Sequence, residues 1–385
     1  MSFNLPRVAV GMSGGVDSSV AAALLKEQGY DVIGVFLHFW KETVDGGVRD
    51  NVCCSLESQT DARRVCEKLK IPFYTMNVAA PFKKEIVDNF LGEYEGGRTP
   101  NPCVRCNRFI KFGEFIKRAR ALGAKFVATG HYVRVEGQRA RFDSEARRAK
   151  GKGQKQGQKA KGKGQKFMQY KLIKGQDRQK DQSYFLHQLT QEQLAHALFP
   201  VGDLTKPEVR RLAAKLGLPT ASKRESQEIC FIPSGDLTEF LKRHIKFSGG
   251  EIRDVDTNKV IGKHSGLPLY TIGQRKGIGL AGGPWYVVSL DRAKNVLWVS
   301  TKEENILSSD CIVKNTNWIG GVNPNFPLKA KCRIRYGAEN ISCVIRKNQA
   351  GDLSVKFSKS QRAVTPGQYC VFYDKEECLG GGIIE

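Results

Sequence analysis

The N-terminal third of the chain alternates short apolar runs with longer stretches that have helical spacing. Four runs have the length and near-continuous hydrophobicity of strands buried on both faces, at residues 7–12, 31–39, 72–78 and 125–132. The stretches between them have the spacing of helices with one apolar face, at residues 16–30, 55–70 and 107–123. This order predicts an α/β fold built on a doubly wound parallel sheet.

The C-terminal part of the chain has a different hydrophobic pattern, in which apolar and polar residues alternate over short stretches. Residues 285–300 predict a hairpin, and residues 328–336 alternate strictly. Ala330, Cys332 and Ile334 face one way, and four cations face the other, namely Lys329, Lys331, Arg333 and Arg335. Short strands with turn signals continue to the last residue, which predicts an antiparallel β-barrel. The cationic face fits a nucleic-acid surface, and it also fits a solvated exterior that blocks edge pairing.

A helical stretch at 204–217 and a glycine-rich segment at 247–283 lie between these two parts. We therefore predict three domains: an α/β domain at 1–215, a small central α+β domain at 216–283, and the barrel at 284–385. Residues 138–166 interrupt the first domain with 11 Lys and Arg against 2 Asp and Glu, in a background rich in Gly and Gln. Such a composition predicts a basic, disordered insertion.

The net charge and the cysteine content indicate the class of binding partner and the cellular compartment. A net charge of +23 over 385 residues indicates a polyanionic partner, with nucleic acid as the leading class. No apolar run approaches the ~20 residues needed to span a bilayer, and the first residues lack the pattern of a secretory signal. Eleven cysteines without such a signal indicate a reducing compartment. We expect a cytoplasmic protein that makes no membrane contact.

The stretch GMSGGVDSS at residues 11–19 joins the first predicted strand to the first helix. Its glycines let backbone N–H groups approach an anion closely, and the helix N-terminus adds partial positive charge. Asp17 would repel a bare phosphate, so we expect a bridging Mg²⁺ near it. The Gly-Lys-Ser/Thr ending of a Walker A loop is absent, so the sequence predicts a phosphate-binding loop of another kind.

Two cysteines, Cys103 and Cys106, stand three residues apart near the start of the helix at 107–123. This spacing puts both thiols on one face, where the helix N-terminus and the nearby Arg105 and Arg108 favour a reactive thiolate. A structural zinc site would need a second such pair, which the sequence lacks. A redox dithiol, part of an iron–sulfur site and a nucleophile with a neighbour remain open. A third cysteine, Cys230, lies in the stretch SQEICFIP, and this local sequence taken alone is typical of a buried structural cysteine.

Two resemblances rest on these motifs. GMSGGVDSS resembles the SGGxDS signature of the PP-loop ATP pyrophosphatases, whose loop binds the pyrophosphate of ATP while a substrate is adenylated. Nearly the whole chain resembles one family of that superfamily, the tRNA-specific 2-thiouridylases, which place sulfur on C2 of the wobble uridine. The segments that carry this resemblance include GMSGGVDSS, TPNPCVRCN (99–107), ATGHYVR (128–134), KDQSYFL (180–186), LFPVGDLTKPEVR (198–210), ICFIP (229–233), TIGQRKGIG (271–279), AVTPGQ (363–368) and CLGGGIIE (378–385).

The resemblance implies a role for each matching position. The implied ATP site consists of Gly11, Met12, Ser13, Gly14, Gly15, Val16, Asp17, Ser18, Leu37 and Gly130. Asn101, Pro102 and Cys103 would contact the target base. Cys106 would be the nucleophile, and Cys230 would accept persulfide sulfur from a relay protein or a cysteine desulfurase, with a transient disulfide between the two. The positions that match tRNA contacts are His131, Lys180, Asp181, Gln182, Arg335, Tyr336 and Gln368. ATP and Mg²⁺ are the implied cofactors.

One position departs from the family pattern. Many members carry aspartate where this chain has Cys103, so a carboxylate is replaced by a third thiol. Cys103, Cys106 and Cys230 then also match three ligands of a [4Fe-4S] cluster that holds an exchangeable sulfur. Persulfide and cluster chemistry are thus alternative hypotheses. A small-molecule adenylating ligase would leave the thiols unexplained, and a non-enzymatic RNA-binding or sulfur-carrying protein would leave the loop at 11–19 unexplained.

Overall fold

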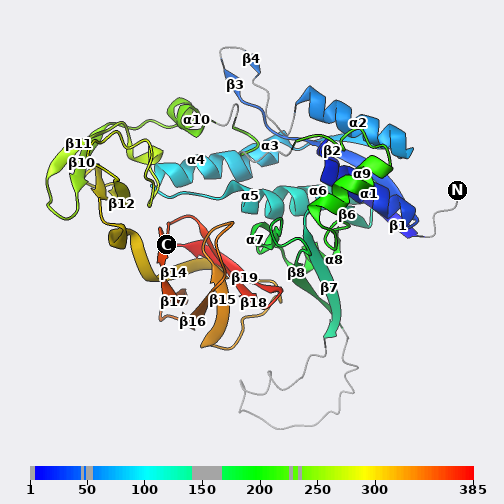
Figure 1. The fold of residues 1–385 in the computed structure, drawn as a ribbon. Coiled ribbons are helices and arrows are strands. Elements are labelled where there is room, and N and C mark those ends of the chain that lie inside the picture. Colours follow the sequence, from blue (N-terminus) through cyan, green and yellow to red (C-terminus); the bar gives the residue numbers. More distant parts are fainter. Residues whose placement is uncertain (1–4, 45–46, 49–54, 141–166, 225–228, 233–235) are drawn as a thin grey trace, which may run out of the picture.

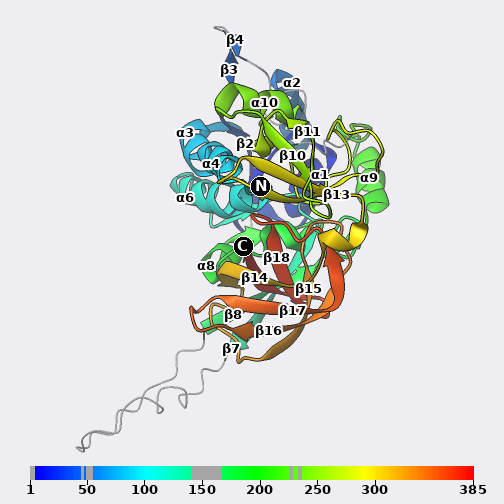
Figure 2. The same cartoon turned by 90° about the vertical axis from the view of Figure 1, so that its left-hand side faces the viewer.

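The computed structural model describes residues 5–44, 47–48, 55–140, 167–224, 229–232 and 236–385 (Figure 1). A parallel sheet with its helices lies at one end of the molecule, a smaller sheet lies at the other end, and a barrel lies below the helices between them (Figures 1 and 2). Within the described ranges, no helix is long and apolar enough to cross a membrane.

The N-terminal sheet is parallel throughout, as predicted. Its strands stand in the order β5-β2-β1-β6-β9, and their bounds are Leu5–Gly11 (β1), Tyr30–His38 (β2), Phe73–Asn77 (β5), Phe126–Ala128 (β6) and Ala197–Leu198 (β9). The chain runs outward from β1 through β2 to β5 and then returns to β6 on the other side of β1. The carboxyl end of β1 is therefore a topological switch point, where α/β sheets bind their ligands.

Helices cover both faces of this sheet because alternate residues of each strand point to opposite sides. Val8 and Val10 pack with one set of helices, α1 (Val16–Glu27), α2 (Leu56–Leu69) and α9 (Lys206–Lys215). Ala9 and Ile33 pack with the other set, which contains α3 (Ala79–Phe82), η2 (Lys83–Val87), α4 (Asp88–Glu95) and the helix that carries the paired cysteines.

The cysteine helix is longer and less regular than predicted. It consists of α5 (Pro102–Arg105), the π-helical segment η3 (Cys106–Glu114) and α6 (Phe115–Ala121), in direct succession. The Asn101 side chain accepts a hydrogen bond from the Val104 N–H (3.4 Å), and Pro102 occupies the first turn, so both residues fix the start of the helix. The backbone hydrogen bonding of a π-helical segment is irregular, and here the Arg108 carbonyl accepts a hydrogen bond from the side chain of Gln193, at 2.7 Å from Nε2. π-helical segments are frequent at functional sites.

The central sheet has the order β11-β10-β13-β12, with bounds Gly250–Asp254 (β10), Val260–His264 (β11), Tyr286–Asp291 (β12) and Val296–Ser300 (β13). The predicted hairpin at 285–300 is confirmed, but its assignment to the C-terminal barrel is wrong. β13 pairs in parallel with β10, and Leu297 shares one core with Ile252 and Val287. The helix α10 (Leu237–His244) precedes this sheet.

The C-terminal part is a closed antiparallel barrel, as predicted, and it begins at β14 rather than at residue 284. Six strands close through the pairing of β14 with β19; their bounds are Leu307–Trp318 (β14), Leu328–Arg333 (β15), Ile341–Lys347 (β16), Leu353–Arg362 (β17), Tyr369–Asp374 (β18) and Glu377–Ile384 (β19). Cys332 and Ile334 are buried in the barrel core and Lys329 and Lys331 are exposed, as the alternation indicated. Arg333 is the exception, because its guanidinium packs over the Tyr373 ring at 5.4 Å.

A hairpin from the N-terminal part extends this barrel. It consists of β7 (Val133–Ala140) and β8 (Phe167–Lys174), and β8 pairs with β19. The predicted insertion at 138–166 thus starts inside β7, and its residues 141–166 lie outside the described part of the chain. Two short helices, α7 (Ser183–Leu186) and α8 (Gln191–Ala195), follow β8.

His187, directly after α7, lies in the contact between these helices and the barrel. Its Nδ1 donates to the Tyr184 carbonyl (2.6 Å), its ring lies 4.9 Å from that of Tyr369, and its own carbonyl accepts from Asn317 Nδ2 (2.9 Å). The side chain is fully buried, and burial lowers the pKa of His187 to about 4. The folded protein therefore holds this imidazole neutral in a pH range where the unfolded chain protonates it.

We predict that this histidine makes the fold sensitive to mild acid. Between pH 6.5 and 4 the unfolded state binds a proton that the folded state does not, so the free energy of unfolding should fall by up to about 3 kcal/mol. Denaturant unfolding at several pH values measures this slope. A His187→Gln variant should show a shallower slope than the parent protein, and identical slopes would contradict the assignment.

Candidate functional site

The loop after β1 is held in shape by its own serines. Gly14 has φ +70°, and a Cβ at this position would lie 2.3 Å from the Ser58 carbonyl oxygen, so only glycine fits. Ser18 Oγ accepts from the Ser13 N–H (3.2 Å) and donates to the Gly15 carbonyl (3.1 Å). Ser19 Oγ donates to the same carbonyl at 2.8 Å. The loop thereby presents the N-terminus of α1, a natural anion-binding position, to the switch point of the sheet.

A cleft of about 200 Å³ opens at this loop. It brings together seven of the residues expected at the ATP site, namely Gly11, Met12, Ser13, Asp17, Ser18, Leu37 and Gly130. Two expected tRNA contacts, His131 and Gln182, also line it. Five further lining residues were not predicted: Phe36, Phe39, Lys111, Phe115 and Thr129. The cleft thus pairs an anion-binding loop with apolar and aromatic walls, which suits a nucleotide with a flat base and charged phosphates.

The connection between β6 and β7 forms another wall of the cleft and packs directly against the start of α1. A Cβ at Gly130 would lie 2.6 Å from the Asp17 carbonyl carbon and 2.7 Å from the Ser18 nitrogen. The neighbouring His131 is paired through Nδ1 with Thr129 Oγ1 (2.7 Å). Burial, and to a lesser degree the charge of Lys111, lowers the pKa of His131 well below its usual value. His131 therefore faces the cleft as a neutral hydrogen-bonding group rather than as a cation.

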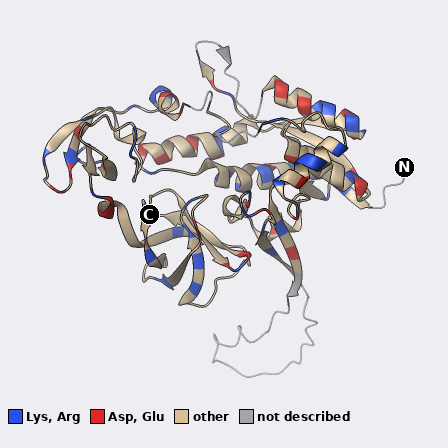
Figure 3. Ribbon diagram, in the orientation of Figure 1, with Lys and Arg blue, Asp and Glu red and all other residues tan. Residues whose placement is uncertain are grey.

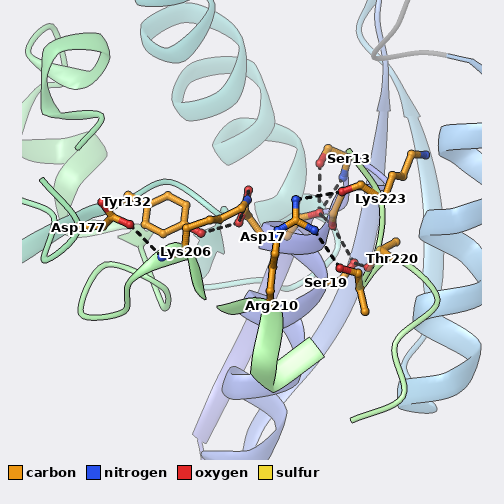
Figure 4. Close-up of polar contacts among 12 residues, drawn as sticks. Ser13, Asp17, Ser19, Tyr132, Asp177, Lys206, Arg210, Thr220 and Lys223 are labelled. Carbon is orange, nitrogen blue, oxygen red and sulfur yellow. Dashed lines mark hydrogen bonds and ion pairs between the residues drawn. The ribbon is translucent and has the colours of Figure 1, made fainter. Parts of the chain in front are cut away.

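Asp17 is held by groups that the sequence patterns do not identify (Figure 4). Tyr132 Oη donates to Asp17 Oδ1 at 2.6 Å, and Lys206 Nζ lies 2.7 Å from Oδ1 and 2.9 Å from Oδ2. Thr220, beyond α9, donates to Ser19 Oγ at 2.9 Å. The sequence LTKPEVR does contain a recognisable helix-start pattern, because Thr205 and Glu208 form a capping box and α9 begins at Lys206. That pattern predicts the helix but not the contact partner of its first residue.

The paired cysteines lie on the helix that also forms part of the cleft. Cys103 is exposed on α5, and Cys106 is buried as the first residue of η3. Lys111, on η3, and Phe115, at the start of α6, line the cleft. Of the two arginines expected to favour a thiolate, Arg105 bonds the Glu85 carbonyl (3.0 Å) and Arg108 bonds Gln188 Oε1 (2.6 Å). These contacts anchor the cysteine helix to η2 and to the segment after α7.

Cys230 packs against the same hydrophobic core as Cys106. Its neighbour Phe231 is fully buried and meets Phe82 and Phe90 edge to face, with ring centroids 5.8 and 5.2 Å apart. These rings flank η2, which contacts α5. The Cys230 segment, expected in the central domain, therefore docks on the N-terminal domain, on the helices next to the cysteine helix.

The three cysteines do not form a metal-binding set. Among the residues that the structure describes, no three His, Cys, Asp or Glu side chains converge closely enough to hold a metal ion. Cys103, Cys106 and Cys230 are thus not arranged as the ligands of a [4Fe-4S] cluster.

The residues expected to contact tRNA come from all parts of the structure. Arg335 and Tyr336 are exposed after β15, and the Tyr336 ring lies 4.5 Å from that of Phe185. Gln368 Nε2 donates to the Thr99 carbonyl (2.8 Å), just before Asn101 and Pro102. Asp181 is buried, and its Oδ1 accepts from the N–H groups of Gly175 (3.2 Å) and Ser183 (3.1 Å). Its visible role is to fix the turn that contains Lys180 and Gln182.

The switch-point loop, the helix N-terminus and the cleft beside them define a nucleotide-binding α/β domain of the PP-loop class. Comparison with protein families agrees with this architecture. Residues 6–234 match the tRNA methyl transferase HUP domain, residues 238–301 match the tRNA methyl transferase PRC-barrel domain, and residues 308–384 match the aminomethyltransferase beta-barrel domain.

Similar curated proteins span the whole chain. The tRNA-specific 2-thiouridylase MnmA 1 of Caldanaerobacter subterraneus subsp. tengcongensis is 48% identical over 98% of both chains. The MnmA of Geotalea uraniireducens is 46% identical over 98% of this chain and 95% of its own, and that of Clostridium perfringens is 42% identical over 98% of both. The chain belongs to the family of tRNA-specific 2-thiouridylases.

We predict that Gly130→Ala closes the cleft against nucleotide. The added methyl group would meet the backbone of Asp17 and Ser18, so the loop must shift, and ATP affinity should fall by about tenfold or more. Isothermal titration with a non-hydrolysable ATP analogue measures the change. Gly92→Ala is the matched control, because a Cβ there, on helix α4, meets nothing within 4 Å. Equal affinity in both variants would show that the nucleotide binds elsewhere.

Proposed function

We propose that this protein uses ATP to thiolate C2 of the wobble uridine in tRNAs for glutamate, glutamine and lysine. The observation that carries the proposal is that one helix contains the nucleophilic cysteine and also lines the cleft at the PP-loop. Cys106 begins η3, and Lys111 on the same segment lines the cleft at the PP-loop. An activated phosphorus in the cleft and a thiol on this helix would thus be held by one rigid element. The family membership supplies the substrate class.

The first step is activation of the uridine. Its C2 oxygen attacks the α-phosphorus of ATP, the bond to the bridging oxygen breaks, and pyrophosphate leaves. A Mg²⁺ ion that accompanies ATP would share the negative charge of the phosphates. The N-terminus of α1 and the loop N–H groups stabilise the departing negative charge, because they are already oriented toward it. An adenylated oxygen is a good leaving group, whereas a carbonyl oxygen is not.

Sulfur transfer follows. Cys230, loaded as a persulfide by a relay protein or a cysteine desulfurase, carries the sulfur that replaces the adenylate. The Cys106 thiolate attacks the inner sulfur of that persulfide and releases hydrosulfide, which attacks C2 and expels AMP. Two thiols are oxidised to a Cys106–Cys230 disulfide while the transferred sulfur is reduced, so an external thiol must restore both cysteines. The target base must leave its stack to enter the cleft.

The barrel offers a surface for the rest of the tRNA. A groove on its exterior is lined by four lysines, Lys329, Lys331, Lys356 and Lys375, with only Asp374 as a counter-charge among its lining residues. Figure 3 shows blue segments along these barrel strands. Lysines spaced along a groove suit a phosphate backbone, which is bound by charge rather than by base identity.

We predict that Cys106→Ser and Cys230→Ser each abolish thiolation but leave pyrophosphate release intact. Serine keeps the shape of the side chain but can neither carry nor displace a persulfide sulfur. Mass spectrometry of nucleosides from treated tRNA measures thiolation, and a coupled assay measures pyrophosphate. Cys66→Ala is the control, since burial raises the pKa of that thiol to about 12 and makes it unreactive. Full thiolation by either serine variant would refute the assigned roles.

We predict a steep salt dependence of tRNA binding that depends on the barrel groove. Replacing Lys329, Lys331 and Lys356 by glutamine should weaken binding, and it should lower the slope of log affinity against log salt by about one for each phosphate that the groove no longer neutralises. Filter binding from low to moderate salt gives the slope. Lys68→Gln, on α2 at the far side of the N-terminal domain, is the control (Figure 1). An unchanged slope in the triple variant would identify the groove as solvated exterior.

A further inference from the structure

The carboxylate of Asp17 stands where a triphosphate is expected to bind. Among the described residues that line the cleft, Asp17 is the only acid. A carboxylate at this position opposes the binding of an anion, and the partial charge of a helix N-terminus is only about half an elementary charge. Lys111 also lines the cleft, but it stands on η3 and not on the loop, so the loop itself needs a further positive charge if it is to receive the pyrophosphate part of ATP.

Lys206 lies in the position to supply that charge. Its Nζ contacts both carboxylate oxygens of Asp17, at 2.7 and 2.9 Å, and its side chain is only 10% exposed. Asp17 lines the cleft and Lys206 does not, so the contact with Asp17 is the route by which this ammonium would act on a nucleotide bound there.

The rest of the structure holds Lys206 firmly in this place. Its backbone N–H donates to Asp177 Oδ2 (2.9 Å), and the Thr205–Glu208 capping box fixes the turn around it. Its ammonium also lies 5.7 Å from the centre of the Tyr132 ring, whose hydroxyl bonds the same carboxylate (Figure 4). Three separate chain segments, at residues 17, 132 and 206, thus converge on one ion pair.

We propose that Lys206 is a positioning residue that neutralises Asp17, so that the PP-loop accepts the phosphates of ATP. The inference rests on the proposed use of ATP and adds the residue on which phosphate binding depends. It also differs from the expectation that Mg²⁺ is the partner of Asp17, because both oxygens already contact an ammonium group. Loss of Lys206 would leave a bare carboxylate in the loop, and loss of both charges would remove the conflict.

A double-mutant cycle on the full-length protein tests this assignment. Affinities for a non-hydrolysable ATP analogue with Mg²⁺ and for adenosine are measured by isothermal titration in the parent, Lys206→Met, Lys206→Gln, Asp17→Asn and the Asp17→Asn/Lys206→Met double variant. Lys171→Met is the control, since it removes another lysine–carboxylate pair, between Lys171 on β8 and Glu377 on β19 (2.7 Å), away from the cleft. Melting temperatures report folding.

We expect both Lys206 variants to lose about tenfold or more in affinity for the ATP analogue and to keep their affinity for adenosine, which has no phosphate. The double variant should return to within about threefold of Asp17→Asn, whereas a merely structural lysine would give no such rescue. A double variant as weak as Lys206→Met would overturn the inference. So would an Asp17→Asn variant that loses affinity and Mg²⁺ dependence together, because Asp17 would then be a metal ligand. A parent protein that binds adenosine but not the ATP analogue would instead refute the proposed function.

Discussion

The hydrogen-bonded position of β1 between β2 and β6 is the constraint on which the site depends. Because the two neighbouring strands lead to connections on opposite sides, the carboxyl end of β1 opens into a crevice. The PP-loop begins at that end, and the connection after β6 returns to it within contact distance of the loop backbone. The strand order brings residue 130 so close to the backbone of Asp17 and Ser18 that only glycine fits there.

The cysteine helix brings two thiols to this frame, Cys103 and Cys106. Its C-terminal half packs under the sheet and lines the cleft, while its N-terminal end projects Cys103 to the surface. The π-helical turn between the two ends changes the direction in which successive side chains point. The Cys230 segment is fixed nearby by the burial of Phe231 rather than by strand pairing, so a thiol distant in sequence joins the same core.

Features that depend on residues close together in the sequence could be predicted, and features that depend on contacts between distant residues could not. Strand and helix periods are local, so the parallel sheet, the 285–300 hairpin and the loop at 11–19 were predictable. The choice of pairing partner is not local: the hairpin alternates in the same way whether it joins a barrel or the central sheet, and only the pairing of β13 with β10 decides. Lys206 and Asp17 are separated by 189 positions, and no period connects them. Arg333 fits the outward register of its strand, yet contact with Tyr373 covers it.

The β7–β8 hairpin has a mechanical consequence. β7 starts one residue after Tyr132, whose hydroxyl bonds Asp17, and β8 is hydrogen-bonded to β19 of the barrel. Hydrogen-bonded strand pairing therefore connects the wall of the cleft to the barrel, from β7 through β8 to β19. The distance between the cleft and the barrel surface is thus set by the geometry of a sheet, and a change in the length or the twist of this hairpin would change that distance.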